Sequence, residues 1–166
     1  MANNPTKGLK QFLTKVQKDL DDATPENMKV KGAEERKNVL NLKILCLVDV
    51  SGSISLEQYN SFMSQLKKVR GLSMVKVVET DTDIVAVYDY FAGNHNKVIK
   101  LGGGGGTDFT EGFKWAKQAK PDAILCLTDG DECGKVPNPK IPVGWITTSA
   151  GCAPYPWGIE ITKVDK

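Results

Sequence analysis

Leu42-Lys-Ile-Leu-Cys-Leu-Val-Asp-Val50 is the stretch that decides the fold, because it has the pattern of a buried strand that ends in a carboxylate. Seven of its nine residues are apolar, as expected of a strand covered on both faces of a sheet. After Asp49, Ser51 and Ser53 add two hydroxyls at positions i+2 and i+4. Small oxygen donors of this kind suit a hard divalent cation such as Mg²⁺. Asp and Ser are also common helix caps, so the same residues fit the start of a helix.

Two further segments place similar side chains after a glycine tract and after a second apolar run. Residues 102–106 are five consecutive glycines, and Thr107 and Asp108 follow them. Residues 123–128 are mostly apolar and run into Asp129. Glycine allows tight turns, so the tract would bring Thr107 close to a cation, although a plain surface loop fits it as well. A phosphate-binding loop is not favoured, because no Lys follows the glycines and G-x-G-x-x-G does not occur.

The remaining patterns predict an α/β fold, with an open, doubly wound, mostly parallel sheet flanked by helices. Helices are expected at 9–20, 56–70 and 109–119. The last two begin at capping boxes, Ser55-Leu-Glu-Gln58 and Asp108-Phe-Thr-Glu111. Strands are expected at 42–50, 74–79, 84–91, 123–128, 143–148 and, at an edge of the sheet, 158–164. Ligands of such sheets bind at the carboxyl ends of strands, which is where Asp49 and Asp129 lie.

The N-terminal helix carries an apolar stripe that has to be covered, either by its own domain or by a partner. Residues 21–38 are polar and charged and contain Pro25 and Gly32, which is typical of a linker. We therefore divide the chain into a helix with its linker, residues 1–38, and an α/β domain, residues 39–166. The α/β domain has its own set of strands and helices, so we expect it to fold without the leader.

The bulk composition excludes several classes of protein. The chain has 166 residues, of which 40% are hydrophobic and 25% charged, as in a single globular domain. A net charge of +2 is too small to indicate nucleic acid as a partner. No apolar stretch reaches 18 residues, so no membrane span is expected. The first residues lack the apolar core of a signal peptide, and we expect a cytoplasmic protein.

The cysteines do not indicate a zinc site. They lie at Cys46, Cys126, Cys133 and Cys152, with no C-x-x-C spacing. Cys46 and Cys126 each precede a motif aspartate by three residues, so both are expected as buried thiols at matching levels of two central strands. Cys133 and Cys152 fall in loops that could approach each other. Without a secretory signal we expect free thiols.

Taken together, D-V-S-G-S, G-G-G-G-T-D and L-T-D-G make the chain similar to the von Willebrand factor A-type (VWA) domain from about Asn41 to Val164. That family binds a divalent cation at a metal-ion-dependent adhesion site. The resemblance implies Mg²⁺ or Mn²⁺ as cofactor. It assigns the five metal-site positions to Asp49, Ser51, Ser53, Thr107 and Asp129.

The resemblance implies a protein-binding module rather than an enzyme. In the family the cation keeps an open position, which a carboxylate of another protein completes. A MoxR-type ATPase of the AAA class is the partner that such domains suggest. The residues of these three motifs are most similar to those in the VWA-like half of prokaryotic proteins labelled as metallopeptidases. The peptidase half is not expected here, because the chain has a single histidine, His95 in a polar loop, and no H-E-x-x-H helix.

Two other functions fit the same residues. Asp49, Asp129 and Asp131 resemble the carboxylates of a metal-dependent nuclease or phosphoesterase, and the domain could also be a structural subunit that only holds an ion. No catalytic residue is assigned, because no histidine base lies near the motifs. Asp108 is expected to cap a helix rather than bind metal. The loop Ala153-Pro-Tyr-Pro-Trp157 either rims the metal face or packs locally.

Overall fold

The computed structural model describes residues 5–28, 41–68, 74–90 and 105–164. These residues form a six-stranded sheet in the order β3-β2-β1-β4-β5-β6, in which only β2 and β3 pair antiparallel. The strands are β1 (Lys43–Asp49), β2 (Met74–Thr80), β3 (Ile84–Tyr90), β4 (Ala123–Thr128), β5 (Val143–Thr148) and β6 (Ile159–Val164). This arrangement confirms the predicted open, mostly parallel α/β sheet, with β6 at an edge.

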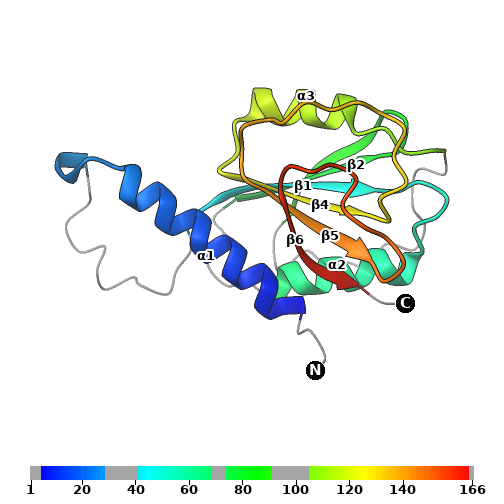
Figure 1. The fold of residues 1–166 in the computed structure, drawn as a ribbon, viewed down its shortest axis with the longest axis horizontal. Helices are drawn as coiled ribbons and strands as arrows, with labels where there is room; N and C mark the ends of the chain where they lie inside the picture. Colours follow the sequence, from blue (N-terminus) through cyan, green and yellow to red (C-terminus); the bar gives the residue numbers. More distant parts are fainter. Residues whose placement is uncertain (1–4, 29–40, 69–73, 91–104, 165–166) are drawn as a thin grey trace.

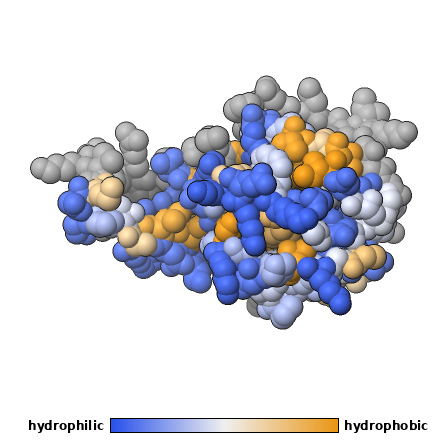
Figure 2. Space-filling model, turned by 90° about the horizontal axis from the view of Figure 1, so that it is seen from above, coloured by the Kyte–Doolittle hydropathy of each residue, from blue (hydrophilic) through white to orange (hydrophobic). Residues whose placement is uncertain are grey.

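Helices cover both faces of the sheet. α1 (Pro5–Ala23) and α2 (Leu56–Lys68) lie on one face, and α3 (Thr110–Ala119) lies on the other (Figure 1). Each face has its own apolar cluster, and successive residues of β1 alternate between them: Ile44 and Cys46 join the α1–α2 side, while Leu45 and Leu47 join the α3 side. Seen from the α3 side, the surface is mainly hydrophilic with separate apolar patches (Figure 2). The fold is therefore a three-layer sandwich with β1 and β4 at its centre.

The central strands place the two buried cysteines on opposite faces. Leu47 pairs with Cys126, and Cys46 pairs with Leu125, so the two thiols stand one residue apart in register. The predicted burial of the two cysteines is confirmed. The prediction that they lie at the same level of the two strands is wrong by one residue. Burial raises the pKa of both thiols, which keeps them protonated and unreactive.

α1 is longer than the pattern at 9–20 predicted, and it packs on its own chain. Leu9, Leu13 and Val16 are buried in the apolar cluster on the α2 face. A Cβ on Gly8 would lie 2.3 Å from the carbonyl oxygen of Ile161, so the first turns of the helix lie directly against β6. The first residues of the predicted linker belong to α1, and a 3-10 turn follows at Glu26–Met28. Residues 29–38 of that linker are outside the described residues.

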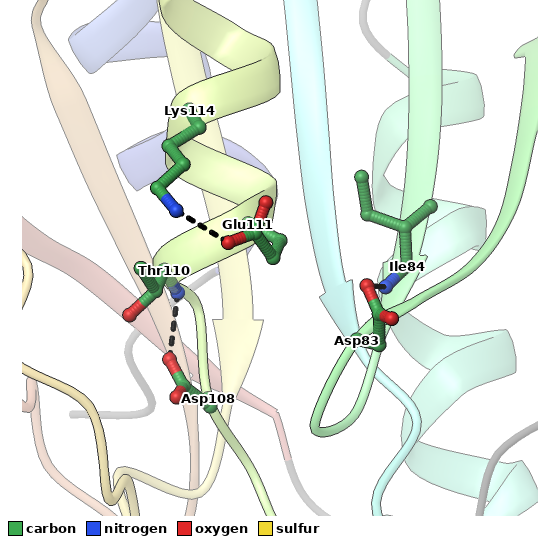
Figure 3. A network of polar contacts seen from close by, with 6 residues as sticks. All are labelled: Asp83, Ile84, Asp108, Thr110, Glu111 and Lys114. Atoms are coloured by element: carbon green, nitrogen blue, oxygen red, sulfur yellow. Dashed lines mark hydrogen bonds and ion pairs between the residues drawn. The ribbon is translucent and has the colours of Figure 1, made fainter.

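The two predicted capping boxes have different outcomes. At α2, the amide of Ser55 donates to Gln58 Oε1 (2.9 Å) and the amide of Gln58 donates to Ser55 Oγ (3.2 Å), so this capping box is confirmed. At α3, Asp108 accepts a hydrogen bond from the amide of Thr110 (2.8 Å), but Glu111 pairs with Lys114 instead of reaching back. Figure 3 shows both contacts. The second capping box is therefore wrong: the N-cap of α3 is Phe109, without a side-chain cap hydrogen bond, and Asp108 closes a local turn just before the helix.

Candidate metal centre

Asp49 ends β1 and is fully buried at the carboxyl edge of the sheet. Its Oδ1 accepts a hydrogen bond from the amide of Ser51 (2.9 Å), and its Oδ2 accepts one from the hydroxyl of Thr128 (3.0 Å). The first bond closes a local turn in the D-x-S-x-S segment, which the short side chain of Asp favours. The second crosses to β4. The carboxylate is thus held from two elements of the fold.

Thr107 lies against the same carboxylate, although 58 residues separate the two in sequence. Its hydroxyl oxygen is 3.2 Å from Asp49 Oδ2 and 3.3 Å from Asp49 Oδ1. Its own carbonyl accepts the amide of Cys133 (3.0 Å), and the preceding loop is joined to the first motif by a bond from the Gly52 amide to the Gly105 carbonyl (3.2 Å). These contacts connect the loops that follow β1 and β4 with the segment before α3. Residues 102–104 of the glycine tract are outside the described residues.

The two serines provide one buried and one accessible hydroxyl. Ser51 is buried and Ser53 is exposed, and their Oγ atoms lie 3.2 Å apart. The loop that carries them ends where α2 begins, so the capping box of α2 helps to fix it. One hydroxyl therefore faces the interior beside Asp49, and the other faces solvent.

Asp129 follows β4 and is half-buried. Its Oδ1 accepts the amide of Asp131 (3.1 Å), which fixes the turn after the strand. Gly130 adopts a left-handed conformation at φ 88°, which an L side chain rarely adopts. Gly151 packs directly behind this turn, since a Cβ there would lie 2.2 Å from the carbonyl oxygen of Asp129. Two glycines from different loops therefore set the position of the Asp129 backbone.

The electrostatics of Asp49 favour a bound cation. Burial raises the pKa of this carboxyl, and the negative charge of Asp129 raises it further, while the hydrogen bonds from Ser51 and Thr128 lower it. A cation between the two carboxylates would compensate both the lost hydration and the mutual repulsion. This is the arrangement expected where a positive charge completes a site.

The spacing of the oxygens also fits a small cation. Neighbouring ligands of an octahedral Mg²⁺ at 2.0–2.1 Å stand about 3.0 Å apart. The Thr107–Asp49 and Ser51–Ser53 oxygen pairs, both at 3.2 Å, are close to that separation. No group of three His, Cys, Asp or Glu that could hold a metal occurs in the described part of the chain. The five candidate side chains offer two carboxylates and three hydroxyls, which are oxygen donors of the kind that a hard cation prefers.

Glu132 connects the loops around this edge and was not identified from the sequence as a positioning residue. Its Oε1 accepts the amides of Phe109 (3.2 Å) and Gly134 (3.1 Å), so it links the loop after β4 to the start of α3. Burial raises the pKa of the Tyr155 phenol, and the nearby Glu132 carboxylate raises it further. Glu132 therefore holds together two of the segments that carry candidate ligands.

The aromatic loop after β5 packs locally. Tyr155 and Trp157 stack at 4.8 Å between ring centroids, and Trp157 meets Phe113 of α3 edge to face at 5.4 Å. Both rings are packed against the α3-side core cluster. The structure thus decides between the two interpretations of this loop in favour of packing. Cys133 and Cys152 are exposed free thiols, as expected.

Thr128 and Gly151 were also not identified from the sequence as residues that position the candidate ligands. Thr128 is the one polar residue of an otherwise apolar strand, and that position at the strand end was the available signal. Nothing in the sequence indicates that Gly151 contacts Asp129, because the contact depends on how two loops cross. His95 is outside the described residues.

A mostly parallel α/β sheet with polar side chains at its carboxyl edge is the architecture of a class of α/β domains that bind ligands at that edge. The chain belongs to the family described as VWA-like domain (DUF2201), whose model matches residues 44–164. A protein of Thermotoga maritima, described only as an uncharacterized protein, is 28% identical over 91 residues. That match covers 53% of this chain and 23% of the Thermotoga protein, so the chain corresponds to a minor part of that relative. No solved structure matches the chain significantly.

No helix within residues 5–28, 41–68, 74–90 and 105–164 is long and apolar enough to cross a membrane.

Proposed function

We propose that this protein is a metal-dependent protein-binding module with a metal-ion-dependent adhesion site. The cation is Mg²⁺ or Mn²⁺, and its ligands are Asp49, Ser51, Ser53, Thr107 and Asp129. The observation that carries the proposal is the approach of Thr107 to Asp49, with oxygens 3.2 Å apart although the residues are distant in sequence. A buried carboxylate with a threonine hydroxyl beside it and a second carboxylate nearby offers oxygen ligands to a cation. Without a cation, the buried negative charge and the repulsion between the two carboxylates are unfavourable.

The site would bind rather than cleave. Five protein groups leave at least one octahedral position for water or for a partner. Ser53 is exposed and Asp129 is half-buried, so the cation would be reachable from solvent. A carboxylate of another protein is the natural ligand for that position. Family resemblance makes a MoxR-type ATPase the first candidate partner, and the larger size of the Thermotoga relative allows other domains to act beside this one.

Calorimetric titration with Mn²⁺ tests the metal site. We expect the wild type to bind one ion per chain and Asp49→Asn to bind none at the same concentrations. Asp89→Asn is the matched control, because Asp89 is an exposed carboxylate of β3 in a surface ion pair with Lys76 (2.6 Å) and should not affect binding. Equal affinity of the wild type and Asp49→Asn would refute the metal assignment.

Partner binding is tested with the immobilised protein and native lysate in Mg²⁺ or in EDTA. The proposal expects defined proteins, identified by mass spectrometry, that the wild type retains in Mg²⁺ only and that Asp49→Asn does not retain. Proteins retained equally in EDTA, or equally by the variant, would contradict metal-dependent binding. A MoxR-type ATPase among the retained proteins would support the candidate partner.

A further inference from the structure

We propose that Thr128 is a positioning residue that orients the Asp49 carboxylate for the cation. The inference rests on the proposed metal site and adds a residue outside its ligand set. Val48 pairs with Leu127, so Asp49 and Thr128 are the next residues along β1 and β4. Both side chains stand on the α3 face of the sheet, following Leu47 and Cys126 in alternation.

The hydroxyl of Thr128 holds two other groups, through its hydrogen and through one of its two lone pairs. It donates to Asp49 Oδ2 at 3.0 Å and accepts the amide of Gly130 at 3.0 Å. A hydroxyl has a single hydrogen to donate, so Thr128 has no second one to offer. Because the same oxygen holds Asp49 and the backbone just after Asp129, it connects both candidate carboxylate ligands. Thr128 therefore fixes their relative position from behind the site.

Thr107 differs from Thr128 in the geometry of its contacts. Its hydroxyl shares its hydrogen between the two oxygens of Asp49, at 3.2 and 3.3 Å, which are longer than the Thr128 bond. A long and divided hydrogen bond holds its donor weakly, so the Thr107 hydroxyl can turn and present an oxygen lone pair to a cation. Asp49 keeps its bonds from Ser51 and Thr128 when Thr107 turns to the metal. The geometry thus separates a ligand threonine from a bracing threonine.

Thr147 provides a matched control within the same row of side chains. It pairs with Thr128 in register across β4 and β5 and is fully buried. Its hydroxyl has no hydrogen-bond partner among the described residues. Replacing Thr147 by Val removes the same atoms as replacing Thr128 by Val, without breaking a bond seen in the described part of the chain.

Mn²⁺ affinity and thermal unfolding of four variants test the inference. We expect Thr128→Val to weaken Mn²⁺ binding roughly 10–100-fold, as is typical when a group orienting a metal ligand is lost. Thr128→Ser keeps the hydroxyl and should restore affinity, and Thr147→Val should bind like the wild type. If Thr128→Val does not fold, Thr128→Ala replaces it in the same measurements, because the smaller side chain lets the neighbouring side chains relax.

The outcomes separate this inference from the metal proposal. Absence of Mn²⁺ binding by the wild type would overturn the proposed function and, with it, the role of Thr128. Binding by the wild type together with unchanged affinity in folded Thr128→Val or Thr128→Ala would overturn the inference alone. Failure of Thr128→Ser to restore affinity, or an equal loss in Thr147→Val, would show a general packing effect and would also overturn it.

Discussion

Gly151 supports Asp129 by close backbone contact, and Gly151→Ala should therefore disable the metal site from a loop that provides none of its ligands. The added Cβ would lie 2.2 Å from the Asp129 carbonyl oxygen and 2.7 Å from its carbonyl carbon. Real Cβ contacts are not shorter than 3.0 Å, so the two backbones have to separate by nearly an ångström. Mg²⁺ demands near-ideal octahedral geometry at 2.0–2.1 Å, so a shift of roughly 1 Å removes Asp129 from the shell.

The expected result is a folded protein with reduced stability and strongly weakened Mn²⁺ binding. Overpacking of this kind typically costs about 1–3 kcal/mol, which urea unfolding measures. Gly106→Ala is the control: among the described residues a Cβ there meets only a methyl group of Thr82, at 3.8 Å, although Gly106 lies beside Thr107. Calorimetry should show near wild-type affinity for Gly106→Ala. Unchanged Mn²⁺ affinity in Gly151→Ala would refute the role of this contact in placing Asp129.

Three further predictions concern the helix, the buried carboxylate and catalysis. Leu13→Ala should lower the free energy of unfolding, measured in urea, by about 2–5 kcal/mol, because Leu13 of α1 is fully buried against the core; a loss well under 1 kcal/mol would contradict the packing of α1. Burial raises the pKa of Asp49, so in EDTA the stability of the wild type relative to Asp49→Asn should fall as pH rises through that pKa; a relative gain with rising pH would contradict the burial argument. The protein should not hydrolyse phosphodiesters, and turnover that Asp131→Asn abolishes would favour the nuclease-like alternative.

The parts of the fold that could be predicted depend on local patterns. The apolar runs of β1 and β4 and the apolar faces of α2 and α3 repeat within a few residues, so their periods are visible in the sequence alone. The approach of Thr107 to Asp49 could be anticipated from the resemblance, whereas the rule for strand ends places Asp49 and Asp129 at one edge of the sheet. Whether these groups bind a cation remains a prediction.

Long-range packing could not be predicted in the same way. The apolar stripe of α1 predicted that this helix packs against another surface, but only the structure shows that Gly8 lies against β6. The hydroxyl of Tyr59 donates to the buried carboxylate of Glu79 at 2.8 Å, and no local pattern indicates that these residues meet. The division at residue 38 stays a prediction, and a chain starting at Arg36 tests it. Because Leu13 is buried in the common core, that truncation would expose apolar surface on the α2 face.

The most direct test of the central claim is the anomalous difference map of a crystal soaked in Mn²⁺. We expect one strong peak at the carboxyl edge of the sheet, within coordination distance of Asp49 and next to Ser51, Thr107 and Asp129. A well-ordered crystal with no peak there, or with its strongest peak at another surface carboxylate, would contradict a metal site at this edge.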